Sequence, residues 1–94
     1  MRIVDASRKF KQALRRLMCG KYRDVVKPGG ELWQVVDALA DDLKLPYAYH
    51  DHALHGKWEG SRECHIYPDL LLIYTYVSED LLSLERLGSH SEIF

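Results

Sequence analysis

The 94 residues, 47% of them hydrophobic and 29% charged, have the size and composition of one globular domain spanning residues 1–94. No apolar run approaches the roughly 20 residues of a membrane span, and residues 1–5 lack the apolar stretch of a signal peptide. Two cysteines are too few for a disulfide framework and lack the spacing of a zinc ribbon. We therefore expect a cytoplasmic protein that neither spans a membrane nor depends on disulfides.

The net charge of −1 hides a strong asymmetry along the chain. Residues 1–30 carry nine basic and two acidic side chains, a net charge of +7, whereas residues 31–94 carry four basic and twelve acidic ones, a net charge of −8. A one-sided basic segment of this strength indicates a polyanion or an acidic protein as partner. It is equally compatible with a solvated helix face that happens to concentrate the positive charge.

The first predicted elements are a short strand and a basic amphipathic helix. Ile3 and Val4 could form the strand. Ser7 is a suitable N-cap, and after it apolar residues recur at i, i+3, i+4, i+7 and i+8 from Phe10 to Met18, which is the spacing of one helical stripe. Basic residues fill the positions between them, so the helix would carry its charge away from the core.

A second helix is predicted after a loop. Residues 21–30 show no periodicity and end in Pro-Gly-Gly, which indicates a loop. Residues 32–43 repeat the helical spacing, and Pro46 closes this helix because the residue before a proline disfavours the helical conformation. Each apolar stripe must be buried against another element, so the rest of the chain has to complete the core.

The remaining residues have the pattern of strands. Residues 62–67 alternate between apolar and polar, residues 70–77 and 81–87 are apolar and separated by turn residues, and residues 90–94 could form a short final strand. Two helices followed by such a meander predict an α+β fold, with the two helices packed on one face of a small antiparallel sheet. The other face of the sheet would then be free for a functional site.

All five histidines lie in the second half of the chain. Neutral imidazole is the side chain best suited to proton transfer near pH 7, so this half is the place to look for acid–base chemistry. His65 and Asp69 flank a Tyr-Pro turn, and a tight hairpin would bring their side chains close together across its two strands.

A candidate anion site follows from the last predicted strand. Arg86, Gly88 and His90 are every second residue, so in a strand that continues through Gly88 they would lie on the same face. Gly88 has no side chain, so a gap would remain between a guanidinium and an imidazole, and a phosphate would fit in it. By the same alternation, Leu82 and Leu84 would lie on the face of the strand that carries Arg86. A twist or bulge must therefore separate the core residues of this strand from the residues of the site.

Cleavage of a phosphodiester requires a base for the nucleophile, an acid for the leaving oxygen and a cation for the charge that develops on the phosphoryl group. The chain offers these side-chain types without a metal ion. The candidate catalytic residues are His52, His65, Asp69, Arg86 and His90.

Other interpretations of these residues stay open at this point. Residues 50–52, together with His55 and Cys64, could form a metal site, although no second ligand pair with typical spacing is present. Without a metal, His50 and His55 would be ordinary exposed histidines and Cys64 a small core residue. Arg86 could be a surface charge, and Phe94 could be an apolar plug at the C-terminus.

Two segments of the second half also carry a family resemblance. Residues 51–74 and 84–94 closely resemble the YafQ branch of the RelE/ParE toxin superfamily through the ordered patterns DHxLxGxWxGxRECHIxPDLLLIY and LERLGSHSEIF. The resemblance implies a RelE-like, microbial-ribonuclease-like fold. It also implies a toxin of a bacterial type II toxin–antitoxin module that cleaves translated mRNA in the A site of the 30S subunit, with no metal ion or other cofactor.

The resemblance further implies roles for individual residues. His90 would protonate the 5′-oxygen leaving group, Arg86 would hold the scissile phosphate, and Phe94 would contact a base. A base cluster of His52, His65 and Asp69 would take the proton from the ribose 2′-OH, so DNA would not be a substrate. One departure is Leu70, because a close relative has an aromatic residue directly after the aspartate.

The resemblance gives the basic first helix two expected partners. Its side chains would contact ribosomal RNA or an acidic segment of a cognate antitoxin of the DinJ or RelB kind, and the residues concerned are Lys11, Arg15 and Arg16. Two other functions of the same fold stay open: a ParE-like toxin that inhibits gyrase, and an inactive module that only binds an antitoxin.

Overall fold

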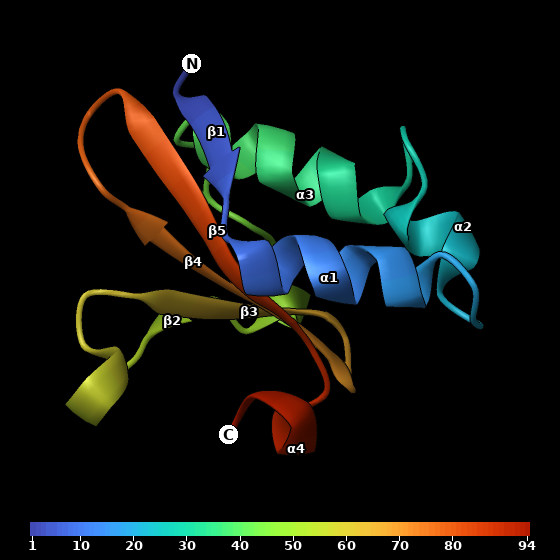
Figure 1. The fold of residues 1–94 in the computed structure, drawn as a ribbon. Coiled ribbons are helices and arrows are strands. Elements are labelled where there is room, and N and C mark those ends of the chain that lie inside the picture. The colour runs from blue at the N-terminus through green and yellow to red at the C-terminus, as the bar shows by residue number, and fades with distance from the viewer.

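The computed structural model describes all of residues 1–94 and has a five-stranded sheet at its centre (Figure 1). The elements follow the chain as β1 (Ile3–Ala6), α1 (Arg8–Leu17), α2 (Arg23–Val26), α3 (Glu31–Ala40), η1 (Tyr47–Tyr49), β2 (His52–Ala53), η2 (Gly56–Trp58), β3 (Arg62–Tyr67), β4 (Leu70–Tyr76), β5 (Leu81–Gly88) and α4 (His90–Ile93). The predicted α+β class, with its antiparallel meander, is confirmed. None of the helices has the length and apolar character needed to cross a membrane.

The sheet differs from the prediction at one edge. Its strand order is β1-β5-β4-β3-β2, and β1 pairs parallel with β5, whereas all the other pairs are antiparallel. The antiparallel strands that the sequence predicts are present, and β1 adds one parallel strand at their edge. No turn joins β1 to β5, because β1 leads directly into α1, so hairpin geometry does not set its direction.

Helix α1 begins where the sequence predicts it. Ser7 is its N-cap: its Oγ accepts a hydrogen bond from the backbone N–H of Phe10 at 3.0 Å. The same hydroxyl donates to the carbonyl oxygen of Glu85 in β5 and so ties the start of the helix to the sheet. Phe10 and Ala13 are buried, and the basic residues lie on the outer side.

Helix α3 is shorter than predicted. It ends at Ala40, because Asp42 adopts a left-handed conformation with φ of 60° and the N–H of Leu43 bonds back to the carbonyl of Ala38 at 2.9 Å. Leu43, which the periodicity assigned to the buried stripe, is 59% exposed. The predicted loop at residues 21–30 is also wrong in part, because it contains the short helix α2.

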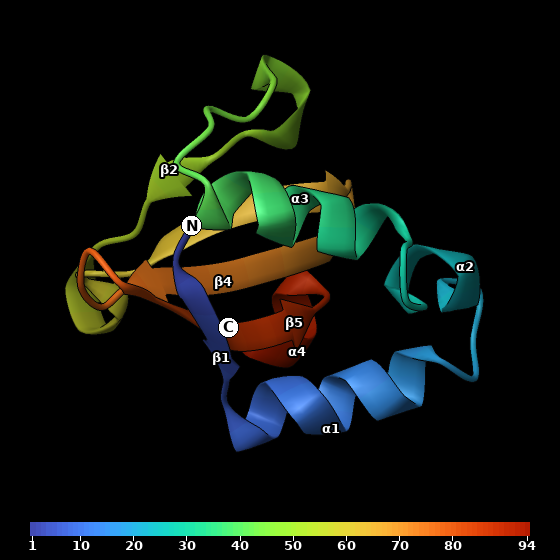
Figure 2. The same ribbon diagram turned by 90° about the horizontal axis from the view of Figure 1, so that it is seen from above.

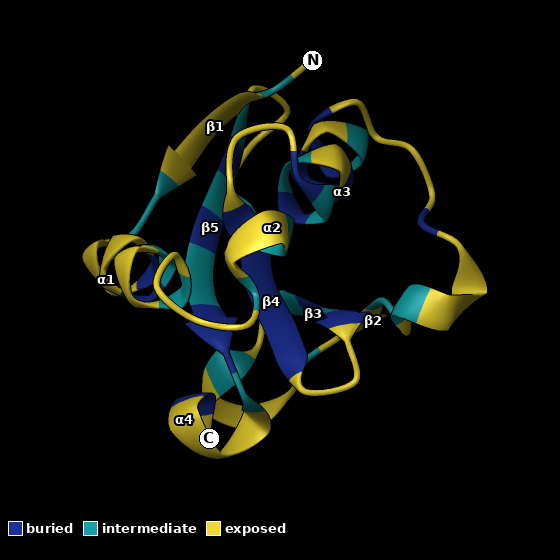
Figure 3. Cartoon of the chain, turned by 90° about the vertical axis from the view of Figure 1, so that its right-hand side faces the viewer, coloured by how far each residue is buried: buried dark blue, intermediate teal, exposed yellow.

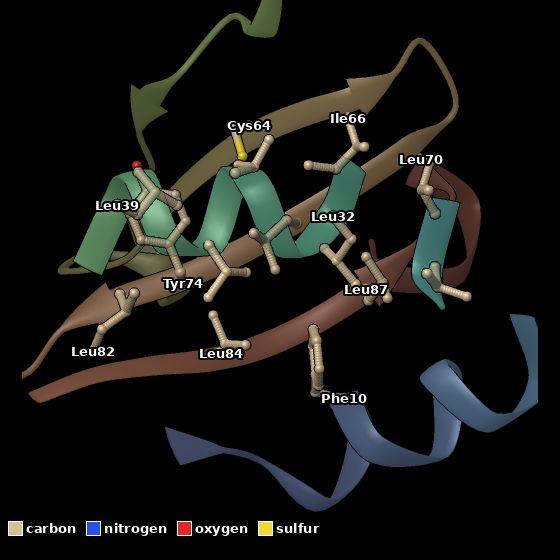
Figure 4. Close-up of a cluster of buried hydrophobic side chains, with 14 of the residues drawn as sticks. Phe10, Leu32, Leu39, Cys64, Ile66, Leu70, Tyr74, Leu82, Leu84 and Leu87 are labelled. Carbon is tan, nitrogen blue, oxygen red and sulfur yellow. The ribbon is translucent and has the colours of Figure 1, made fainter. Parts of the chain in front are cut away.

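Helices α1 and α3 lie on the same side of the sheet and share one core with it (Figure 2). Figure 4 shows Phe10 of α1 and Leu32 of α3 meeting side chains of the three central strands in one layer. Cys64 is part of this layer and has no exposed surface, and burial raises the pKa of its thiol. The interpretation of Cys64 as a core residue is confirmed.

A bulge in β5 separates the core from the second face of the sheet. The register pairs Ile73 with Arg86 but Tyr74 with Leu84, so β5 has one extra residue, Glu85, at this point. Leu84 therefore packs in the core while Arg86, two positions later, lies on the other face. The predicted irregularity between Leu84 and Arg86 is confirmed.

The chain ends in a helix rather than in the expected strand. Ser89 caps α4 through a capping box with Glu92, and Gly88 makes the sharp change of direction with φ of 152°. Ile93 of α4 packs on Leu71 and Ile73 against the second face of the sheet, so this face is partly covered. Figure 3 shows β4 buried over most of its length and α4 largely exposed at one end of the molecule.

Candidate active site

The strand register places one row of side chains across the face of the sheet opposite α1 and α3. It pairs His52 with Glu63, Glu63 with Ile73, and Ile73 with Arg86. Directly paired residues of antiparallel strands carry their side chains on the same face. Since neighbouring strands are about 4.8 Å apart, the backbones of Glu63 and Arg86 are separated by about 10 Å.

A second row lies next to the first one. It contains His65, Leu71 and Gly88, and His90 follows Gly88 by two residues at the start of α4. The sequence predicted that His90 continues the last strand on the same face as Arg86 and Gly88. This prediction is wrong, because β5 ends at Gly88. Ile93 packs on Leu71 and Ile73, so α4, which begins with His90, still lies against the face that carries His65.

Glu63 is at the centre of the histidine cluster. Its side chain is 8% exposed, and its Oε2 lies 3.0 Å from Nε2 of His52 and 3.8 Å from Nε2 of His65. The other carboxylate oxygen is buried without a hydrogen-bond partner. Glu63 is not among the site residues predicted from the sequence, although its position two residues before His65 puts both on one side of the strand.

His52 is held at both ring nitrogens. Its Nδ1 lies 2.6 Å from the carbonyl oxygen of His50, while Nε2 faces Glu63. A carbonyl can only accept, so Nδ1 carries the hydrogen in this arrangement. The rings of His50 and His65 meet edge to face at 5.7 Å between centroids, so His50 adjoins the two histidines that face the carboxylate. Among His, Cys, Asp and Glu side chains, no three are arranged to hold a metal ion.

Asp69 lies apart from this cluster. It is exposed in the turn between β3 and β4, and it lines a cavity of about 370 Å³ with Gly88 and Ser89 at the start of α4. His65 instead borders a different cavity together with His50. The structure therefore groups Asp69 with the beginning of α4, and the bulge between His65 and Tyr67 displaces the turn from the simple hairpin that the sequence suggested.

Arg86 borders a basic groove. Its Nη2 donates to the carbonyl oxygen of Glu92 at 3.3 Å, which joins β5 to α4. The groove has a volume of about 620 Å³, and three further cations line it: Arg8, Lys9 and Lys57. These come from the first turn of α1 and from η2, so only the folded chain brings them to Arg86. Such a concentration of positive charge suits a phosphate backbone.

Aromatic side chains border this groove. Trp58 lines it, and the rings of Trp58 and Phe94 meet edge to face at 5.9 Å between centroids. Phe94 is also 4.9 Å from the ring of His90 and is 45% exposed. The exposed ring could stack on a nucleobase beside the candidate acid.

Residues 2–94 match the family described as the bacterial toxin of type II toxin–antitoxin systems, YafQ. The chain belongs to this family. It is 45% identical over 67 residues to a YafQ toxin of Haemophilus influenzae and 46% identical over 56 residues to the mRNA interferase toxin YafQ of Escherichia coli K12. These matches cover 68% and 60% of this chain, and 66% and 60% of the two relatives.

Solved structures of bacterial toxins match over the whole chain. A copper-bound mutant toxin from Helicobacter pylori has a TM-score of 0.87 at 39% identity, with full coverage of both chains. The E. coli DinJ–YafQ complex has a TM-score of 0.80 at 29% identity, with 100% of this chain and 99% of that chain covered. The fold is therefore the RelE-like fold that the sequence resemblance implied.

Two features set this YafQ-family chain apart from the sequence-based expectation. Leu70, at the position where an aromatic residue was expected, is 1% exposed and packs in the core, so it offers RNA no stacking surface. The three residues of α1 that were expected to contact RNA or an antitoxin are also dispersed: Arg16 pairs with Glu92 at 3.1 Å, Arg15 lines a separate apolar groove, and Lys11 is exposed.

Proposed function

We propose that this YafQ-family toxin is a ribosome-dependent endoribonuclease that cleaves translated mRNA without a metal ion. One observation supports this most strongly: His52, His65 and Arg86 lie in adjacent rows on one face of the sheet, and His90 lies at the end of that face. The E. coli relative is named an mRNA interferase, which supports the same conclusion.

The proposed reaction is an internal transfer at phosphorus. The base is drawn from His52 and His65 of the histidine cluster and from Asp69, which acts from its separate position in the turn between β3 and β4. It takes the proton of the ribose 2′-OH, and the 2′-oxygen attacks the adjacent phosphorus. The bond from phosphorus to the 5′-oxygen breaks, and His90 gives that oxygen a proton. The products are a 2′,3′-cyclic phosphate and a free 5′-hydroxyl.

The surrounding side chains assist both ends of this reaction. One carboxylate oxygen of Glu63 lies 3.0 Å from Nε2 of His52 and 3.8 Å from Nε2 of His65, so Glu63 orients the two imidazoles together. Arg86 stabilises the charge that develops on the phosphoryl oxygens, and the cations of the same groove hold the flanking phosphates. Phe94 stacks on a base next to the cleaved bond.

The proposed partners are the ribosome with its mRNA and a cognate antitoxin of the DinJ or RelB kind, met in the cytoplasm. The solved E. coli DinJ–YafQ complex supports the antitoxin. The basic outer face of α1 offers complementary charge to an acidic antitoxin segment or to the phosphates of ribosomal RNA in the 30S A site.

Mapping the ends of mRNA on ribosomes tests the proposal. Ribosomes carrying a defined mRNA are incubated with the wild-type protein, with His90→Ala, and with His55→Ala as a matched control on an exposed histidine outside the site. The wild type and the control should cleave at the same positions, and His90→Ala should lose roughly 10²- to 10⁴-fold in rate. Intact mRNA with the wild type would overturn the proposal, and accompanying DNA breaks would indicate a gyrase-directed toxin instead.

A further inference from the structure

A separate cavity opens beside the histidine cluster at the unpaired end of β3. β2 pairs only with Arg62 and Glu63, so the outer edge of β3 beyond them faces η1 rather than another strand. The cavity has a volume of about 460 Å³, and its lining includes Glu31, Tyr49, His50, His65, Tyr67 and Pro68. His65 therefore belongs both to the candidate base cluster and to the wall of this cavity.

A carboxylate forms the polar part of the wall. Oε2 of Glu31 accepts a hydrogen bond from the hydroxyl of Tyr49 at 2.7 Å. Hydrogen bonding to this carboxylate raises the pKa of Tyr49 to about 12 and also raises the pKa of Tyr67, so both phenols stay protonated. An ionised carboxylate accepts at about four lone-pair positions, so Glu31 keeps free acceptor positions beside the tyrosines.

Aromatic rings form another part of the wall. Tyr67 stacks on Tyr22 with 5.7 Å between centroids and an interplanar angle of 29°, and it is still 40% exposed. The stack with Tyr22 holds one face of the ring, so the exposed surface is available to a planar ligand. This is the stacking surface that the buried Leu70 cannot provide.

We propose that this cavity is a nucleobase subsite that takes a guanine next to the scissile phosphate. The inference rests on the proposed function and deepens it. RNA that reacts at His65 must pass along the wall of the cavity, and a base turned out of the strand there stacks on Tyr67. The subsite lies on the β3 side of the face, whereas Phe94 lies on the α4 side, so the two would contact different bases.

The preference for guanine follows from the acceptor character of Glu31. Guanine presents two adjacent N–H donors on its Watson–Crick edge, N1–H and the N2 amino group, which match the two oxygens of a carboxylate. Adenine and cytosine present an amino group next to a ring acceptor, and uracil presents one N–H between two carbonyl oxygens. In these three bases an acceptor would face the carboxylate, which disfavours them.

The test measures base preference rather than activity alone. A pool of mRNAs with randomised codons is cleaved on ribosomes by the wild type, by Glu31→Gln and by Tyr67→Ala, and the cleavage ends are sequenced. The wild type should favour guanine at one fixed position beside the cleaved bond. Glu31→Gln still accepts from Tyr49 but places an amide donor towards guanine, so the preference should fall about 5- to 150-fold at that position alone. Tyr67→Ala should weaken it by loss of stacking.

A matched control and a folding check make the outcomes distinct. Glu79→Gln, in the exposed turn between β4 and β5, should keep the wild-type base profile. Thermal melting shows which variants fold. Wild-type cleavage without guanine preference, or a folded Glu31→Gln or Tyr67→Ala variant with an unchanged profile, would overturn the subsite. Absence of any wild-type cleavage would instead be a failure of the proposed nuclease function.

Discussion

A buried carboxylate such as that of Glu63 is costly unless charged or hydrogen-bonding partners compensate for the loss of water. Here Nε2 of His52 lies at 3.0 Å and Nε2 of His65 at 3.8 Å, so these two imidazoles are the groups that compensate for burial when they are protonated. Glu63 is thus a positioning residue for the proposed base cluster. It also links β2, which is only two residues long, to the centre of the sheet.

Glu63→Gln tests this role because it keeps the shape and removes the charge. We expect a folded protein whose rate of mRNA cleavage on ribosomes falls about 10- to 100-fold, since misplacing a catalytic group by about 1 Å costs on the order of 10²-fold. Glu59→Gln, on an exposed loop glutamate, is the control. A Glu63→Gln variant with the wild-type rate would show that the carboxylate is not needed to position the histidines.

Tyr74 positions the same histidines from the core side. It has no exposed surface, and its hydroxyl donates to Oδ1 of Asp51, the residue between His50 and His52. Nε of Arg62 lies 3.3 Å from the same oxygen. Burial, followed by the hydrogen bond to Asp51, raises the pKa of Tyr74, so it remains a donor throughout the stable pH range.

Tyr74→Phe should therefore destabilise the fold by about 1–3 kcal/mol, because Asp51 loses a donor in a partly buried position. In a domain of this size that corresponds to a fall in Tm of roughly 4–8 °C for each kcal/mol, measurable by thermal unfolding. Tyr47→Phe, at a tyrosine that is 90% exposed, should leave the Tm unchanged. Equal melting temperatures for the two variants would show that the Asp51 contact contributes nothing.

At the scale of elements, the short helix α4 determines where the candidate acid lies. Its position depends on three features: the turn at Gly88, the capping box of Ser89 with Glu92, and the bond from Arg86 to the carbonyl of Glu92. A Cβ at residue 88 would lie 2.9 Å from Oε1 of Glu92 and would require a backbone conformation that only glycine adopts easily.

Gly88→Ala is expected to shift α4 and with it His90. The strain amounts to about 1–3 kcal/mol, so the variant should melt at lower temperature and cleave mRNA more slowly than the wild type. Gly20→Ala is the matched control, because a Cβ there has its nearest neighbour at 4.0 Å. Wild-type cleavage by Gly88→Ala would contradict the claim that the turn places His90.

The same helix should loosen in acid. Hydrogen bonds from Ser89 to the carboxylate, reinforced by Arg16 and Arg86, lower the pKa of Glu92 from its ordinary value of 4.5. A carboxyl group with a lowered pKa in the folded state stabilises that state above its ordinary pKa and loses this contribution as pH falls through the lowered value. Fluorescence of Trp58, which contacts Phe94, should report a transition below about pH 4.5. The transition should be absent in Glu92→Gln.

At the scale of the whole molecule, the sequence was most informative where structure depends on local spacing. The apolar stripe after Ser7 predicted α1, and alternation with turn residues predicted β3, β4 and β5. The strand predicted for residues 90–94 is helix α4 in the structure. The apolar residues of this segment did not reveal the capping box that Ser89 and Glu92 form. The parallel pairing of β1 with β5 places Ile3 beside Leu81. These residues are far apart in the sequence, so no local pattern predicts their pairing.

The candidate site shows the same contrast between what the sequence predicts and what only the folded chain brings together. The resemblance and the side-chain types identified His52, His65, Arg86 and His90, all of which are on or beside one sheet face. Glu63 was missed because its importance comes from a partner eleven residues away that β2 brings next to it. Arg8, Lys9 and Lys57 were missed for the same reason, since only the folded chain gathers them around Arg86.

The most direct test of the central claim, that these side chains cut RNA through the ribose 2′-OH, replaces that single hydroxyl. Ribosomes carry either an all-RNA message or the same message with one 2′-deoxy nucleotide on the 5′ side of the cleaved bond. We predict complete protection of that bond by the deoxy substitution, with a 2′,3′-cyclic phosphate on the product of the unmodified message. Cleavage of the deoxy bond, or products with a 5′-phosphate, would contradict the account.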